Sequence, residues 1–122
     1  MKVNSLKTSE QFWQKSILKF DSSIQQAISN LNNSGLKIVL VVNNKNDFIG
    51  TISDGDIRRG LLKNLNINDD IKNIIHYEAL VVHPEFTKES ALKLMELNQI
   101  FQIPIINSQK NVVGLFLRHS MV

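Results

Sequence analysis

Ser53 and Asp56 are two side chains whose types and spacing could hold a ligand. They lie in the string GTISDGD, residues 50–56, where we expect a strand to end and a helix to begin. A helix N-terminus presents free backbone N–H groups and the positive end of the helix dipole, which together suit a phosphate. The Ser53 hydroxyl can bond a phosphate, and the Asp56 carboxylate can accept two hydrogen bonds from a ribose diol. The pattern is therefore compatible with a nucleotide site.

The same two residues also fit a purely structural role. In a capping box, a serine side chain bonds to the third N–H of the helix, and the acid three residues on bonds back to the N–H of the cap. Spacing alone favours this interpretation, and both remain open at the level of sequence.

The elements that must position these residues occur twice along the chain. An ungapped shift of 64 positions superposes the two halves. Helix-face residues, turn residues and a strand then coincide: Ala27 with Ala91, Leu31 with Met95, Asn43 with Asn107, Gly50 with Gly114, and 39–42 with 103–106. An internal repeat of this kind predicts two copies of one structural unit.

The apolar pattern predicts a helix and a β-hairpin in each half, and a further helix after the hairpin of the first half. In the first half the apolar spacing predicts a helix over 23–34, capped by Ser22 or Ser23 and stopped by 33–35. Strands over 37–42 and 48–52 and a helix over 54–64 follow it. The second half predicts a helix over 87–99 capped by Thr87, and strands over 102–107 and 111–117. Short apolar segments, 17–18 and 80–82, precede the two first helices, and 69–75 predicts a linking turn of helix.

Two features lie at the ends of the chain. Phe12 and Trp13 lie in a short helical segment, 9–15, which we expect to pack against the rest of the chain or a dimer partner. The counterpart of helix 54–64 would begin near Ser120, but the sequence ends at Val122. We therefore expect the natural protein to continue, and this chain to be a fragment of it.

Two helix–hairpin–helix repeats, the first with G-x-x-S-x-x-D, resemble a tandem pair of CBS domains, the Bateman module, over about residues 16–119. The resemblance implies an α/β fold of two β-α-β-β-α repeats about a pseudo-twofold axis, divided as 1–65 and 66–122, and a homodimer. It also implies binding of AMP, ADP or ATP and regulation of an attached catalytic domain. The longer string 53–62 resembles pairs fused to sugar-1-phosphate nucleotidyltransferases or to arabinose-5-phosphate isomerases. Because the pair is N-terminal in the nucleotidyltransferases and this chain starts at Met1, we expect the nucleotidyltransferase.

The resemblance implies roles for individual residues. Ser53 and Asp56 would contact phosphate and ribose, with Thr51 beside the base. The other repeat would face the adenine with six residues: Ala79, Leu80, Val81, Gln102, Ile103 and Pro104. Gln102 stands where some family members carry a basic phosphate ligand, but its amide carries no charge.

Two arginines and the second repeat complicate this assignment. Arg58 or Arg59 could supply the missing charge, although a solvated helix face is the commoner role for such residues. In the second repeat, Leu117 and Ser120 occupy the hydroxyl and acid positions. We therefore expect at most one good site per chain, and a structural dimerisation module without a ligand is the alternative.

Composition excludes several other classes of function. The 14 Lys and Arg and 11 Asp and Glu are spread along the chain, with a net charge of +3, which argues against a nucleic-acid partner. No apolar run reaches membrane-spanning length and no signal peptide is visible, so we expect a cytoplasmic protein. The sequence contains no Cys, and the spacing of its three His residues does not suit a metal site. No nucleophile or acid–base set stands out, so we expect this chain to have no catalytic activity and no cofactor.

Overall fold

The structure is a computed structural model that describes residues 11–120, apart from the side chain of Ser120. The chain divides after Ala79 into two compact units. We call the described residues 11–79 the first unit and residues 80–120 the second unit. Each contains one copy of the helix and hairpin that the sequence repeat predicts.

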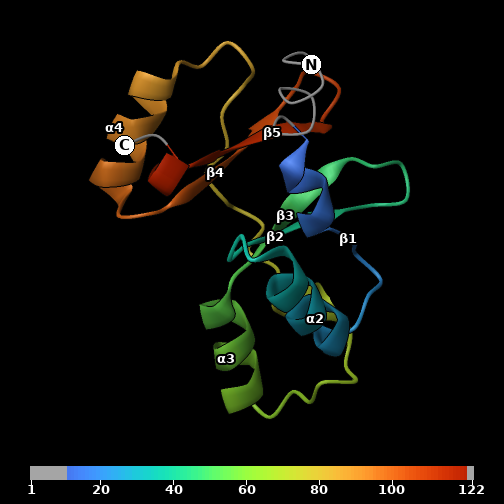
Figure 1. The fold of residues 1–122 in the computed structure, drawn as a ribbon. Helices are drawn as coiled ribbons and strands as arrows, with labels where there is room; N and C mark the ends of the chain where they lie inside the picture. The colour runs from blue at the N-terminus through green and yellow to red at the C-terminus, as the bar shows by residue number, and fades with distance from the viewer. Residues whose placement is uncertain (1–10, 121–122) are drawn as a thin grey trace. The chain divides into compact units, whose positions relative to one another are not determined.

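The first unit contains a three-stranded sheet of order β1-β2-β3. Strand β1 pairs with β2 in parallel, and β2 pairs with β3 antiparallel. Helix α2 contacts both β2 and α3 (Figure 1). The elements, in chain order, are η1 Phe12–Ser16, β1 Ile17–Lys19, α2 Ile24–Ser34, β2 Val39–Val42, β3 Phe48–Ile52, α3 Asp54–Leu62 and η2 Ile71–Asn73.

The core of the first unit explains why these segments adopt their structures. All four residues of β2 are buried, as in a central strand covered on both faces. Helix α2 buries Ile24 and Ala27, which belong to one stripe of its surface. The buried residues packed together are Ile24, Ala27, Val39, Val41, Ile52, Ile57, Ile71, Ile74 and Ile75. They come from the helices, the sheet and the segment after α3, so the core fixes α3 against the sheet.

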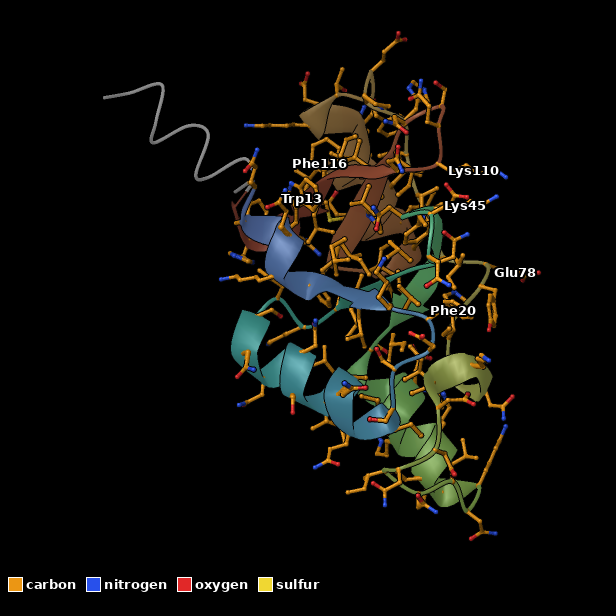
Figure 2. The ribbon with its side chains drawn as sticks, turned by 90° about the vertical axis from the view of Figure 1, so that its right-hand side faces the viewer. Trp13, Phe20, Lys45, Glu78, Lys110 and Phe116 are labelled. Atoms are coloured by element: carbon orange, nitrogen blue, oxygen red, sulfur yellow. The ribbon has the colours of Figure 1, made fainter. Side chains whose placement is uncertain are left out.

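The second unit repeats the design in a smaller form. Helix α4, Lys88–Asn98, precedes β4, Gln102–Ile106, and β5, Val112–Leu117, which pair antiparallel (Figure 1), and η3, Arg118–Ser120, follows. Its core consists of Val82, Ala91, Met95 and Ile103, and Phe116 (labelled in Figure 2) is among the side chains packed around it. The counterpart of β1 is reduced to one parallel bridge between Val82 and Ile105.

The two hairpin turns share the same pattern of asparagine hydrogen bonds. The Oδ1 atoms of Asn43 and Asn107 each accept hydrogen bonds from the backbone N–H groups two and four residues later, at 2.9–3.0 Å. Asn46 and Lys110 take the same left-handed conformation, with φ 66° and 70°. Lys45 and Lys110 are labelled in these turns in Figure 2. The register also shifts after Val41 and after Ile105, 64 positions apart. The predicted repeat is therefore present in the structure.

The helix ends confirm the predicted caps. The Ser23 side chain accepts from the third N–H of α2, and the Thr87 side chain does the same for α4. Both helices end on a left-handed residue, Gly35 with φ 68° and Gln99 with φ 55°. Of the two serines proposed as caps, Ser23 is therefore the one that caps α2.

Several predicted boundaries were wrong by one or two residues. The strand predicted over 37–42 begins at Val39, because Lys37 has φ 65°, which is incompatible with an extended strand. The helix predicted over 54–64 ends at Leu62, and Asn64 has φ 76°. These left-handed residues end the regular backbone earlier than the apolar pattern indicated.

The N-terminal segment packs as expected but in a different helical form. It is a 3₁₀ helix over Phe12–Ser16, and residues 9 and 10 of the predicted segment lie outside the described residues. Trp13 (labelled in Figure 2) is buried, and η1 contacts α2. Asn30 Nδ2 on α2 donates to the carbonyls of Lys15 and Ile17, at 3.2 and 3.3 Å. The segment is therefore attached to the first unit by both packing and hydrogen bonds.

Candidate functional site

The start of α3 forms the capping box that the sequence allowed. Ser53 Oγ accepts from the Asp56 N–H at 3.2 Å. Asp56 Oδ2 accepts from the Ser53 N–H at 2.8 Å and from the Ser53 hydroxyl at 2.9 Å. The structural interpretation of this pair is therefore confirmed. It also fixes the carboxylate beside the free N–H groups of the first helical turn.

The other oxygen of Asp56 is held by an arginine. Arg59 Nη2 lies 2.8 Å from Asp56 Oδ1. The side chain of Asp56 is 18% exposed and that of Arg59 is 63% exposed. An exposed pair of this kind contributes at most about 1 kcal/mol to stability. Of the two arginines singled out from the sequence, Arg59 is thus the one that contacts the candidate ligand residue.

Thr51 is held in the sheet next to this corner. It pairs with Leu40 on one side and with His76 on the other, where Thr51 N–H donates to His76 O at 3.1 Å and His76 N–H donates to Thr51 O at 2.8 Å. Gly50 makes this approach possible, because a Cβ there would lie 2.6 Å from the His76 carbonyl oxygen. The chain after η2 is therefore fixed beside β3.

A cavity of about 420 Å³ lies between α3 and this returning segment. Helix α3 and its C-terminal end line it with Asp56, Arg59, Gly60 and Lys63. The opposite wall is Leu65 and residues 73–76, among which Ile74 and Ile75 are buried. The lining thus combines apolar surface, one carboxylate, two cationic side chains and the His76 imidazole. Such a lining suits a ligand that carries both hydroxyl groups and negative charge.

The predicted adenine-facing residues fall into two groups, residues 79–81, where the first unit ends and the second begins, and residues 102–104 on β4. Ala79 is half-buried, and Leu80 and Val81 expose 39% and 37% of their surface. They directly precede Val82, whose N–H donates to Pro104 O at 3.0 Å. Ile103 and Pro104 are fully buried in β4, whereas Gln102 at the start of β4 is half-buried. The apolar surface accessible to a planar ring therefore comes from Leu80 and Val81, because Ile103 packs in the core.

The matching corner of the second unit has no comparable pair. Leu117 occupies the position equivalent to Ser53 and is buried. Arg118 follows it, with its guanidinium 5.9 Å from the centre of the Phe101 ring and 3.5 Å from Glu96 Oε2. Ser120, the predicted equivalent of Asp56, has no described side chain. The described residues of this corner thus provide apolar packing and a weak ion pair.

Two residues of the cavity were missed by the sequence analysis as ligand candidates. Lys63 follows Asp56 by seven positions, so helical periodicity could have placed both on one face of the helix predicted over 54–64. His76 had no local signal, because it reaches the site only through its pairing with Thr51, 25 residues earlier in the chain.

No helix within residues 11–120 is both long and apolar enough to cross a lipid bilayer. Within the same range, no three His, Asp or Glu side chains are grouped so that they could hold a metal ion.

Sequence comparison places both halves of the chain in one family. The family model described as CBS domain matches residues 17–63 and again residues 71–122. An uncharacterised protein of Helicobacter pylori is 27% identical over 107 residues, and the arabinose 5-phosphate isomerase KdsD of Pseudomonas aeruginosa is 24% identical over 102 residues. Each alignment covers 83% of this chain but 31% of the relative. The chain therefore spans about a third of the length of these curated relatives.

Solved structures share the fold at low sequence identity. CBSX2, solved in complex with AMP, has a TM-score of 0.73 and 17% identity, and the alignment covers 86% of this chain and 82% of that one. The cytosolic domain of the Mg²⁺ channel MgtE, solved in complex with ATP, has a TM-score of 0.69 and 14% identity, with coverage of 83% and 41%. The predicted α/β fold with two CBS repeats is confirmed by the family match and by these likenesses.

Proposed function

Because this chain belongs to the CBS domain family, with two CBS repeats along its length, we propose that it is a regulatory module that binds an adenine nucleotide, AMP, ADP or ATP, at the start of α3. Asp56 accepts hydrogen bonds from the ribose hydroxyls, and the Ser53 corner with the first turn of α3 receives phosphate. Thr51 lies beside the base. The module has no catalytic role of its own in this proposal.

One observation supports this function most strongly. The Asp56 carboxylate lies at a helix N-terminus and also lines a cavity of about 420 Å³ that carries two cationic side chains. This volume is within the usual range for small-molecule sites. A capping box alone requires no such cavity, so a ligand explains more of this corner than helix capping does.

The proposed adenine contacts come from the second repeat. Leu80 and Val81 offer exposed apolar surface for the ring, and the backbone N–H and C=O groups near Leu80 can hydrogen-bond to its edge. On β4 the half-buried Gln102 is the remaining proposed contact, whereas Ile103 and Pro104, which the resemblance also implied, are fully buried and would lie behind it. Two proteins of this fold, CBSX2 and the MgtE cytosolic domain, were solved with AMP and ATP, which supports an adenine nucleotide as the ligand class.

We propose that the module regulates an attached enzyme that acts on a sugar phosphate. The string 53–62 resembles the pairs of sugar-1-phosphate nucleotidyltransferases, which is our first candidate for that enzyme. The relative KdsD, an arabinose 5-phosphate isomerase, favours the isomerase as a second candidate. Both candidates handle phosphorylated sugars, so the class of the attached enzyme is common to them.

The alternative function is a structural module that dimerises without a ligand. It is favoured by the loss of the hydroxyl and acid positions in the second repeat, where Leu117 is buried. A homodimer is part of both proposals, so the presence of a dimer does not separate them. Ligand binding does.

A thermal-shift titration tests the proposed function. The chain is titrated with AMP, ADP, ATP, GTP and S-adenosylmethionine. A ligand at a hundred times its Kd stabilises the folded state by about 2.7 kcal/mol, which corresponds to a Tm rise of several degrees. We expect this rise with at least one adenine nucleotide.

Two carboxylate variants complete the test. Asp56→Asn keeps an oxygen for the Ser53 N–H but removes the charge, and we expect it to abolish the shift. Asp54→Asn removes the same charge from the same helical turn, outside the residues that line the cavity, and we expect it to keep the shift. A flat response of the wild-type chain to the whole panel, with a stable dimer, would establish the structural module instead.

A further inference from the structure

The Asp56 carboxylate is nearly saturated with hydrogen bonds in this structure. Its Oδ2 receives the Ser53 N–H and the Ser53 hydroxyl, and its Oδ1 receives Arg59 Nη2. A carboxylate has about four acceptor positions in total. A ribose diol has two O–H donors and needs two acceptor positions, but only one acceptor position on the Asp56 carboxylate is free. The diol and Arg59 therefore compete for Asp56 Oδ1.

Arg59 is well placed to give up this position. Its side chain is 63% exposed, so leaving the ion pair removes little packing. It also lines the cavity, together with Lys63 and His76. A guanidinium can bind phosphate through two parallel hydrogen bonds, which are stronger than its single hydrogen bond to Asp56. The cavity thus offers Arg59 a second partner only when an anion enters it.

We propose that Arg59 exchanges partners when a phosphorylated sugar binds. In the free protein its guanidinium holds Asp56 Oδ1. In the complex it holds the phosphate where the Ser53 corner borders the cavity at Asp56, with Lys63 as a second cation, and the released Oδ1 accepts the sugar hydroxyls. This inference rests on the proposed function, because it takes Asp56 as the diol acceptor. The ligand chemistry is a ribose phosphate, which either a nucleotide or a free sugar phosphate supplies.

The exchange makes the phosphate a condition for tight binding. AMP displaces Arg59 from Asp56 but offers it a phosphate in return. Adenosine displaces the same guanidinium and offers it no new partner. Arg59 therefore favours AMP through attraction and disfavours adenosine through competition, so its removal should move the two affinities in opposite directions.

The test measures the affinity of the whole chain for AMP and adenosine by isothermal titration calorimetry. We expect Arg59→Gln to weaken AMP binding at least about tenfold, the usual scale of a lost charge-assisted hydrogen bond, and to tighten adenosine binding. Arg58→Gln is the matched control, because it removes the same charge from the neighbouring exposed residue, which does not line the cavity. It should change both affinities by less than about twofold.

Three outcomes overturn the exchange. Arg59→Gln could leave AMP binding unchanged, could leave adenosine binding unchanged or weaken it, or could match Arg58→Gln in every titration. Lys63→Gln gives a second readout, since it should weaken AMP and spare adenosine. An equal effect of Lys63→Gln on both ligands would place the phosphate outside the cavity and also overturn the proposal.

Asp56→Asn separates this inference from the proposed function. If it abolishes AMP and adenosine binding while Arg59→Gln has no effect, the nucleotide site stands and the exchange is wrong. If the wild-type chain binds no nucleotide and no ribose 5-phosphate, both are wrong. If ribose 5-phosphate binds as tightly as AMP and responds to Arg59→Gln in the same way, the exchange stands and the adenine is not recognised.

Discussion

At the scale of single residues, the candidate site depends on a few close approaches. Gly50 lets the His76 backbone pair with β3, and Gly60 lets α3 approach Ile74, where a Cβ would lie 2.5 Å from Ile74 Cγ2. Both contacts bring the segment 73–76 against α3 and β3. The wall of the cavity opposite Asp56 therefore exists because two positions lack a side chain.

This dependence predicts that Gly50→Ala destabilises the protein. The new Cβ would lie 2.6 Å from a backbone oxygen, and overpacking of this kind typically costs about 1–3 kcal/mol. Urea unfolding measures the change. Gly114→Ala is the matched control from the second repeat, because its Cβ would meet the Ile105 Cδ1 atom at 2.9 Å, the movable end of a side chain. A cost for Gly114→Ala equal to that for Gly50→Ala would contradict the argument.

The residue scale also shows where sequence reasoning succeeds at the site. Ser53 and Asp56 were identifiable because their relation is local and spans three positions. The Arg59 contact is equally local, and i, i+3 spacing singles out Arg59 over Arg58. His76 was recognisable only in the fold, because the pairing that brings it to the site joins distant parts of the chain.

At the scale of elements, the repeat provides two versions of each helix end and turn. Helix α2 ends at a glycine and α4 at a glutamine, although both residues are left-handed. A residue with a Cβ in this conformation costs about 1–2 kcal/mol relative to its right-handed form, and glycine does not bear this cost. The second unit therefore carries strain at Gln99 that the first unit avoids at Gly35.

We accordingly predict that Gln99→Gly stabilises the protein by about 0.5–1 kcal/mol. The reverse change at the equivalent position, Gly35→Ala, should destabilise it by a similar amount. Thermal unfolding of the two variants beside the wild-type chain measures both effects. The prediction fails if Gln99→Gly lowers the melting temperature.

Helix caps and turns were predicted well, because local residue types determine them. Strand bounds were predicted poorly, because pairing with another segment determines them. The caps at Ser23 and Thr87 and the turns at Asn43 and Asn107 follow from residue types alone. The start of β2 at Val39 could not be predicted from residue types. Lys37 before it is left-handed, and lysine is not a residue type that indicates a left-handed backbone. The reduction of the segment 80–82 to a single bridge at Val82 was also unpredictable, since its apolar sequence is the same as that of a short strand.

At the scale of the whole chain, two similar units carry unequal sites. The first has the Ser53–Asp56 pair and the cavity of α3. The second has buried Leu117 in the position of Ser53. The repeat therefore forms the same fold twice, but among the described residues only the corner at the start of α3 has a carboxylate acceptor.

This asymmetry predicts one nucleotide per chain. Calorimetric titration with AMP should give a stoichiometry near one, and Asp56→Asn should reduce it to none. Two equivalent sites per chain, or binding that survives Asp56→Asn, would contradict the assignment. Asp54→Asn serves again as the matched control and should leave one site.

The paired hairpin turns also determine how the chain can begin to fold. In each turn an asparagine side chain closes a loop of five residues by accepting hydrogen bonds from two backbone N–H groups. Closing so short a loop costs little chain entropy, and isolated hairpins of this type form in about 1–10 μs. Each half of the chain therefore contains its own starting point for folding, and neither half needs the other to set the register of its strands.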